Sequence, residues 1–296
     1  MNTASFEPIT ALNADLHCHS TVSDGTRSPT WLAQHAHDQG VQLWALTDHD
    51  EVGGIAEARQ AASALGLAFL SGVEISVSWQ EKTIHIVGLG LDENHPALVE
   101  GLRRTRGGRE ERAREMAEQL AQVGIHGAYE GALKYVGNPD LISRSHFGRF
   151  LVEAGVCRDI PEVFRRFLTE GKPGFVPHQW ATLDNAVHWI VQAGGMAIVA
   201  HPARYGLTPA QEQMLFAEFK RAGGLGLEVV TSAHTDAEMA HYAQVAREWG
   251  FYASRGSDFH SPDESRVALG DIPRLPEGLS PVWQALVHRI QMPQQA

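Results

Sequence analysis

The sequence is poor in cysteine and has no long apolar run. Only Cys18 and Cys157 occur among its 296 residues, and their separation gives no thiolate metal site. No segment approaches the roughly 18 apolar residues that a membrane-spanning helix needs, and residues 1–10 contain no basic residue of the kind that opens a secretory signal. These absences predict a cytoplasmic protein with no membrane partner and with Cys18 as a buried core thiol.

Positive charge is also scarce. Lysine and arginine together number 24, against 35 aspartate and glutamate residues, and the net charge is -11. Broad coating of nucleic acid relies on a basic surface, so this class of function is disfavoured. Some of the carboxylates are candidate metal ligands, whose charge a bound cation would neutralise. An anionic substrate is still compatible with this composition if a cleft holds it locally.

Short apolar runs alternate with helical patterns, which predicts an α/β fold. Ser28 as N-cap, Pro29 at the first helical position and Gly40 as a stop bracket the first helix. The near-continuous apolar character of the strands favours a parallel, buried sheet, and their number favours a closed, irregular barrel. Strands are expected at 13–18, 41–47, 67–77, 82–91, 195–200, 225–230 and 252–257, and further helices at 53–65, 208–222 and 236–249.

The interval 97–183 breaks this rhythm. Helical patterns near 110–123, 142–154 and 160–169 have no convincing strand between them. We therefore expect a helical insertion carried on one loop of the barrel. The expected division of the chain is a first part of the barrel at 12–96, the insertion at 97–183 and a second part of the barrel at 184–288.

Histidines and carboxylates cluster where the expected strands end. His17 and His19 are two apart on the first strand, so both imidazoles leave the same face and suit one cation. Two ionisable groups in adjacent interior positions would be costly without such a partner. Asp15 lies on the same face and is expected to orient one of the histidines.

Five later positions extend this cluster. His49 follows an apolar strand, at the end that carries the active site in parallel barrels. Glu74 interrupts an apolar strand, where either a metal bridge or a buried salt bridge would satisfy it. His85 alone is as compatible with a core histidine as with a ligand. Asp258 and His260 repeat the two-residue spacing after the last strand and are expected to bind metal.

The order of these motifs resembles that of the PHP (polymerase and histidinol phosphatase) domain family. The matching motifs are Asp15-x-His17-x-His19, Ser23-Asp24-Gly25, Thr47-Asp48-His49, the strand-end Glu74, two further histidines and Gly256-Ser257-Asp258-x-His260. The resemblance implies a distorted (β/α)7 barrel that holds three divalent metals. Nitrogen and oxygen ligands suit manganese, which we expect, as well as iron or zinc. The implied ligands are His17, His19, Glu74 and Asp258 for the first metal, Glu74, His85 and His146 for the second, and Asp24, His49 and His260 for the third.

The same resemblance implies a metal-dependent phosphoesterase. Two bridged cations would lower the pKa of a shared water, and the resulting hydroxide would attack phosphorus. His201, in an Ala-His-Pro sequence at a strand end, is either a further ligand or the donor that protonates the leaving oxygen, and we expect the second role. His201 and Asp15 are thus the side chains expected to assist catalysis.

The insertion is expected to select the substrate. Its Ser-Arg-Ser-His-Phe-Gly-Arg sequence, together with the chain length, looks most like a stand-alone bacterial group of the family. That group hydrolyses the 3′-phosphate of nucleoside 3′,5′-bisphosphates, and some members trim short RNA from the 5′ end. Arg144 and Arg149 are candidates to grip a second phosphate, and Lys172 and His178 are further candidates for substrate binding.

Three alternatives stay open. A histidinol-phosphate phosphatase would need a carboxylate for the substrate amine, for which Glu170 or Asp184 are available. A catalytically inactive PHP module would be expected to have lost ligands, and this chain keeps them. A metal-dependent amide hydrolase with a carbamylated lysine is disfavoured because no lysine lies in the strand-end motifs. No obligate protein partner is expected.

Overall fold

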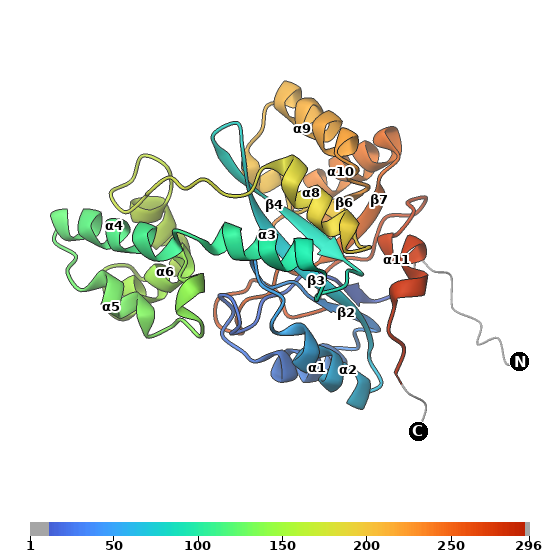
Figure 1. Cartoon of the computed structure of the whole chain (residues 1–296), viewed down its shortest axis with the longest axis horizontal. Coiled ribbons are helices and arrows are strands. Elements are labelled where there is room, and N and C mark those ends of the chain that lie inside the picture. The colour runs from blue at the N-terminus through green and yellow to red at the C-terminus, as the bar shows by residue number, and fades with distance from the viewer. Residues whose placement is uncertain (1–11, 294–296) are drawn as a thin grey trace, which may run out of the picture.

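Seven strands form one sheet in which each strand pairs with the next along the chain (Figure 1). The computed structural model describes residues 12–293. The backbone N–H of Leu16 donates to the carbonyl of Arg255 at 3.1 Å, so the first and last strands meet and nearly close the barrel. The expected distorted (β/α)7 barrel is confirmed. Its strands are β1 (Ala14–Asp15), β2 (Leu43–Leu46), β3 (Ala68–Trp79), β4 (Lys82–Leu89), β5 (Met196–Val199), β6 (Gly226–Thr231) and β7 (Tyr252–Gly256).

The expectation of a parallel sheet is wrong at β4, which runs antiparallel to both β3 and β5. A turn of two residues joins β3 to β4, because Trp79 pairs directly with Lys82. Gln80 and Glu81 have φ angles of 44° and 64°, the left-handed conformation that a two-residue hairpin turn requires. Such a short turn leaves no room for the crossover helix of a parallel pair.

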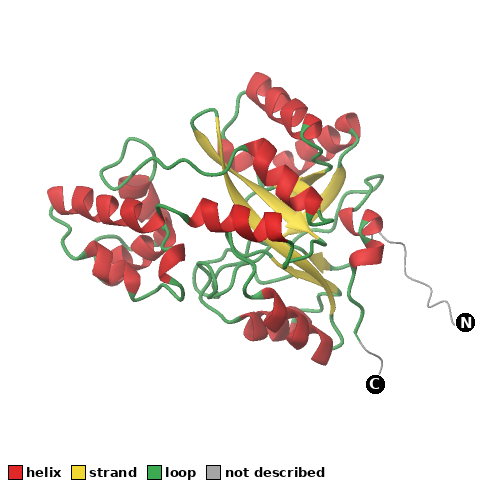
Figure 2. Cartoon of the chain, viewed as in Figure 1, coloured by secondary structure: helices red, strands yellow, loops and turns green. Residues whose placement is uncertain are grey.

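Helices cover the outside of the barrel (Figure 2). The side chain of Ser28 accepts a hydrogen bond from the N–H of Trp31, which caps the first helix at its expected start. The helices around the barrel are α1 (Pro29–Asp38), α2 (Ile55–Ala64), α8 (Leu183–Gln192), α9 (Pro209–Arg221), α10 (Asp236–Trp249) and α11 (Val282–Ala285), with short turns η4 (Pro202–Tyr205) and η5 (Val287–Arg289). Among residues 12–293, no helix is long and apolar enough to cross a membrane.

The remaining helices belong to the segment between β4 and β5. Most of them lie to one side of the barrel, whereas α3 lies over the barrel itself (Figure 1). They are α3 (Pro96–Arg106), α4 (Arg109–Gln122), α5 (Ala128–Leu133), η2 (Pro139–Leu141), α6 (Arg144–Glu153), α7 (Ile160–Val163) and the π-helical turn η3 (Phe164–Leu168). A separate core that includes Met116, Leu120, Phe147 and Leu151 holds α4 to η3 together. Helix α3 packs on α8 of the barrel instead. The domain limits at 97 and 183 stay a prediction.

Candidate metal centre

The strand ends bring the expected ligands to one end of the barrel. Parallel strands direct their carboxyl ends to the same edge, so residues far apart in sequence meet there. Of the residues named from the sequence, eight side chains form three groups whose nitrogen and oxygen atoms lie within 4.8 Å of one another. The groups are His17, His19, Glu74 and Asp258; His19, Asp24, His49 and His260; and His49, Glu74 and His85.

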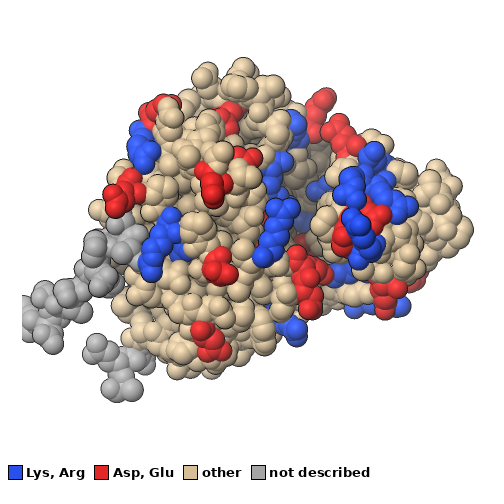
Figure 3. All heavy atoms as spheres, turned by 180° about the vertical axis from the view of Figure 1, so that it is seen from behind, with Lys and Arg blue, Asp and Glu red and all other residues tan. Residues whose placement is uncertain are grey.

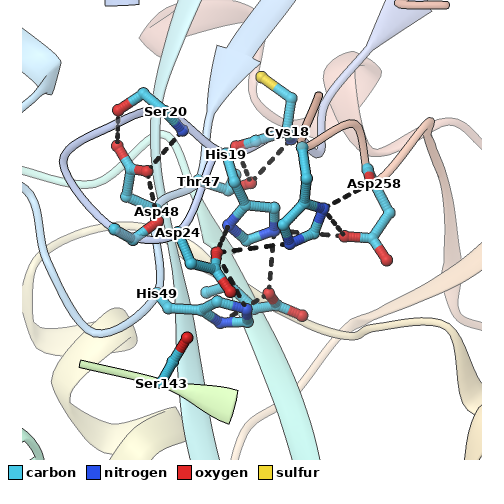
Figure 4. Close-up of polar contacts among 12 residues, drawn as sticks. Cys18, His19, Ser20, Asp24, Thr47, Asp48, His49, Ser143 and Asp258 are labelled. Atoms are coloured by element: carbon cyan, nitrogen blue, oxygen red, sulfur yellow. Dashed lines mark hydrogen bonds and ion pairs between the residues drawn. The ribbon is translucent and has the colours of Figure 1, made fainter. Parts of the chain in front are cut away.

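Buried polar atoms at the centre of these groups fit divalent cations. Oε2 of Glu74, Nε2 of His17 and Nε2 of His19 are buried and make no hydrogen bond. Nε2 of His19 lies 3.2 Å from Oε2 of Glu74 and 3.3 Å from Oδ1 of Asp258 (Figure 4). Buried polar atoms without partners are costly, and a cation between imidazole and carboxylate would satisfy them.

The charges of the cluster also favour a bound cation. Burial by itself lowers the pKa of His19, but the carboxylates of Asp258 and Glu74 raise it to about 10. Burial likewise raises the pKa of Glu74, yet His85, His17 and His49 hold it well below its usual range. The carboxylates thus stay negative in a buried site, and they attract any positive charge placed among them.

His201 and His85 converge on one oxygen. Nε2 of His201 and Nδ1 of His85 each lie 2.9 Å from Oε1 of Glu74. The backbone of His201 has a φ of 26°, and its N–H donates to Oε2 of Glu228 at 2.7 Å, which holds this strained conformation. Burial and the charge of Arg204 lower the pKa of His201 to about 3. His201 faces Glu74 together with His85, as a metal ligand would, and its expected role as proton donor stays a prediction.

Within residues 12–293, His146, the ligand expected for the second metal site, belongs to none of the three groups, although its Nε2 is buried and makes no hydrogen bond. Its Nδ1 accepts a hydrogen bond from the N–H of Ser143 at 3.0 Å, as part of the capping box that begins α6. The capping geometry uses one ring nitrogen for the helix start. His201 occupies the position beside Glu74 and His85 that the sequence assigned to His146.

Asp15 contacts backbone instead of orienting an imidazole. Its carboxylate accepts hydrogen bonds from the N–H of Ser257 at 2.9 Å and of Gly270 at 2.7 Å. Its nearest contact with His17 is the backbone N–H, at 3.5 Å. Asp15 therefore fixes the segment that carries Asp258, and the expected catalytic role is not supported.

The two aspartates that flank His49 also hold backbone. Asp48 accepts hydrogen bonds from the N–H of Ser20 at 2.7 Å and the hydroxyl of Ser23 at 2.6 Å, which positions the loop before Asp24 (Figure 4). Asp50 accepts the N–H of Ser76 at 2.8 Å and pairs with Arg109 of α4. Loop and insertion are thus both anchored beside the cluster.

Glu228 is part of the site, although it was not predicted from the sequence. Its Oε1 lies 2.9 Å from Nδ1 of His17, and its Oε2 accepts the N–H of His201. A carboxylate behind a ligating imidazole fixes the ring and raises its basicity. The available signal was one carboxylate in the apolar strand 225–230, the same signal that identified Glu74.

Arginines from the insertion line the cavity over the cluster. Arg109, Arg112 and Arg144 share this cavity with Arg204 of η4 and with Trp180. Among residues 12–293, neither Arg112 nor Arg144 forms an ion pair with a carboxylate. Their guanidinium groups donate to the carbonyls of Val176 and Leu168 and lie over the rings of Trp180 and Phe164, respectively. Burial and neighbouring arginines lower the pKa of Arg112 to about 9 and that of Arg144 to about 10. Figure 3 shows basic side chains, interspersed with acidic ones, on both sides of the hollow between barrel and insertion.

Known proteins resemble the chain over nearly its whole length. The PHP domain matches residues 15–105. A 3′,5′-nucleoside bisphosphate phosphatase of Chromobacterium violaceum is 49% identical over 281 residues, which are 95% of this chain and 99% of that protein. The chain belongs to the PHP family. A 5′-3′ exoribonuclease of Haemophilus influenzae is 41% identical over 270 residues, 91% of this chain and 97% of that protein.

Solved structures agree with the PHP assignment. A structure from Chromobacterium violaceum, described as an amidohydrolase with bound sulfate and no metal, superposes with a TM-score of 0.93 at 48% identity and covers 96% of this chain and 99% of that one. A candidate metal-dependent phosphoesterase of Bifidobacterium adolescentis gives a TM-score of 0.79 at 26% identity, covering 94% and 96%. The fold that the chain shares with these structures therefore includes both the barrel and the insertion.

Of the four substrate-binding candidates in this PHP protein, only Arg144 lines the cavity over the cluster. Arg149 is buried, and its guanidinium donates to Glu264 at 2.7 Å and to the carbonyl of Asp24 at 2.6 Å. Lys172 is exposed and does not line this cavity. The ring of His178 packs edge-on against Trp180 at 4.3 Å and supports that side chain from behind.

Proposed function

We propose that the protein is a metal-dependent phosphoesterase that removes the 3′-phosphate of nucleoside 3′,5′-bisphosphates and leaves 5′-mononucleotides. One observation carries the proposal: a metal-fitting cluster and the guanidinium groups of Arg112 and Arg144, free of carboxylate partners, line a single cavity. The cluster suits the phosphate that is cleaved, and the two arginines suit the phosphate that is kept. The Chromobacterium violaceum relative carries the corresponding name.

Three divalent cations would occupy the cluster, and manganese is the proposed metal, with iron or zinc also compatible. When bound, they would neutralise the phosphate oxygens and lower the pKa of a water molecule. The ligands proposed for the three sites are His17, His19, Glu74 and Asp258; Glu74, His85 and His201; and Asp24, His49 and His260.

The chain's own side chains would bind and orient the nucleotide. Arginine grips a phosphate through two parallel hydrogen bonds, and partial burial strengthens such charge-assisted contacts. Arg204 donates to Oδ2 of Asp258 at 2.7 Å, which keeps that carboxylate aimed at the cluster. Trp180 lies 4.5 Å beneath the guanidinium of Arg109 and fixes the cavity wall from which Arg112 also projects.

The positive charge of the cavity disfavours histidinol phosphate, the substrate of the main alternative function. A cationic amine would face Arg109, Arg112 and Arg144, and it would be repelled. Glu170, one of the carboxylates considered for the amine, lines a different cavity. Asp184 lies in the first turn of α8, outside the cavity over the cluster.

The proposed substrate of this site is accordingly a small nucleotide. Short RNA is a second proposed substrate, because the Haemophilus influenzae relative is named a 5′-3′ exoribonuclease. We also propose a cytoplasmic location. Cys18 and Cys157 are both buried and unpaired, as free thiols are in a reducing compartment.

The test is phosphate release by manganese-loaded protein from adenosine 3′,5′-bisphosphate, 3′-AMP, 5′-AMP and histidinol phosphate in parallel. We expect the bisphosphate to be preferred over 3′-AMP by a factor of about 10 to 100, the worth of one charged phosphate contact. Equal rates for the bisphosphate and 3′-AMP would remove the role of the arginines. Preference for histidinol phosphate would overturn the substrate class.

A further inference from the structure

A second cavity, of about 340 Å³, opens beside the metal cluster. This volume lies within the roughly 300–1,000 Å³ that small-molecule sites occupy. The two cavities meet at the cluster, because they share five lining residues: Ser145, Phe164, Arg204, Asp258 and His260. They extend from it in different directions: Arg112 lines only the first, whereas Arg266, from the loop after β7, lines only the second.

The second cavity combines one free positive charge with an apolar wall. Ile160, Pro161 and Phe164 of the insertion form the wall. Within the described residues, Arg266 forms no ion pair or hydrogen bond, and its side chain is exposed. Arg149 lines the same cavity, but Glu264 and a backbone carbonyl already take up its guanidinium. A free guanidinium opposite an aromatic and aliphatic surface suits a nucleotide, which needs a cation for its phosphate and a flat surface for its base.

We propose that the second cavity holds the nucleotide that follows the scissile phosphate in a short single-stranded RNA. Arg266 contacts the next phosphate of the chain, and the base lies against Phe164 and Ile160. This inference rests on the proposed function, because the 5′-terminal nucleotide must occupy the first cavity with its 5′-phosphate on Arg112 and Arg144. In this arrangement the enzyme removes nucleotides from the 5′ end of the RNA.

The same bond breaks in both proposed substrates. Water adds to phosphorus, the bond from phosphorus to O3′ breaks, and O3′ leaves with a proton as the 3′-hydroxyl of a 5′-mononucleotide. With the bisphosphate, the other product is inorganic phosphate. With RNA, the phosphate stays on the shortened strand and becomes its new 5′-phosphate. The second cavity therefore holds the strand that leaves, and the first holds the mononucleotide.

The experiment compares kcat/KM for adenosine 3′,5′-bisphosphate with kcat/KM for a 5′-phosphorylated RNA pentamer, in manganese-loaded protein. Arg266→Ala is expected to lower the RNA-to-bisphosphate ratio about fivefold, the effect of one exposed phosphate contact, and to weaken the salt dependence of RNA cleavage. Arg266→Lys should restore part of the ratio because the charge is kept. Arg165→Ala is the matched control, since Arg165 is exposed on the insertion and lines neither cavity.

Two outcomes would overturn the inference. If the RNA-to-bisphosphate ratio of kcat/KM is unchanged in Arg266→Ala, the RNA strand does not pass through the second cavity. Equal losses on both substrates would show that the second cavity binds the mononucleotide itself. Failure of the proposed function would be visible separately, because the wild-type protein would then not hydrolyse the bisphosphate.

Discussion

Nδ1 of His17 lies 2.9 Å from Oε1 of Glu228, and this contact connects the segment that follows β1 to β6. The other ring nitrogen of His17 faces Oε2 of Glu74 at 3.2 Å. A proton on Nδ1 is therefore held by Glu228, which leaves Nε2 free to bind a cation. The tautomer that the metal cluster needs is set by a residue outside it.

Glu228→Gln should weaken metal binding by a factor of about 10 to 100, as removal of a carboxylate behind a ligating histidine does. Chelator competition measures the affinity, and circular dichroism checks the fold. Glu212→Gln is the matched control, because Glu212 pairs with His241 at 3.0 Å, outside the metal cluster. Equal metal affinity in both variants would contradict the role given to Glu228.

His201→Asn and His146→Asn separate the two candidates for the second metal site. His201→Asn should lower the number of bound metals by one, because Nε2 of His201 shares Oε1 of Glu74 with His85. His146→Asn should keep the wild-type metal number, since the ring caps α6. Metal analysis by mass spectrometry after dialysis gives the count. The reverse pattern would restore the assignment made from the sequence.

Arg144→Ala should weaken binding of the 5′-phosphate, which is not cleaved. We expect kcat/KM for adenosine 3′,5′-bisphosphate to fall by a factor of about 10 to 100, with a much smaller loss for 3′-AMP, because a charged hydrogen bond is lost only with the first substrate. Arg114→Ala on α4 is the control, as Arg114 is exposed and paired with Glu110. Equal losses on both substrates would place Arg144 at the cleaved phosphate instead.

The pair between Arg109 and Asp50 should stabilise the junction between insertion and barrel. Both side chains are buried, and Asp50 follows directly after His49. Arg109→Met should lower the free energy of unfolding by about 3 kcal/mol, because it leaves a buried carboxylate without its cation. Urea denaturation followed by tryptophan fluorescence measures the loss. Arg103→Met, which removes an exposed pair with Glu100, should have little effect, and a similar loss there would contradict the account.

The positions of the strands along the chain could be predicted from the sequence, but the direction of one strand could not. Apolar runs and a helix cap such as Ser28 are local signals. They placed the seven strands and most of the long helices, although α3 and α8 were not expected. The direction of β4 depends on the turn at Gln80 and Glu81, whose positive φ angles carry no glycine or asparagine signal.

The site shows the same division between local and long-range information. His17 and His19 could be paired from strand alternation, and the structure brings both to Glu74. The sequence could not separate Arg144 from Arg149, because Glu264, which neutralises Arg149, lies 115 residues further along the chain. The sequence also could not decide between His201 and His146, because the contact between His201 and Glu74 joins residues 127 positions apart in the chain.

The nucleotide left after manganese-loaded protein acts on adenosine 3′,5′-bisphosphate shows which of the two phosphates is cleaved. Chromatography against authentic standards identifies it. We predict 5′-AMP, because the cluster would bind the 3′-phosphate while Arg112 and Arg144 hold the 5′-phosphate. Accumulation of 3′-AMP would mean that the two phosphates occupy the opposite positions, and it would contradict the account.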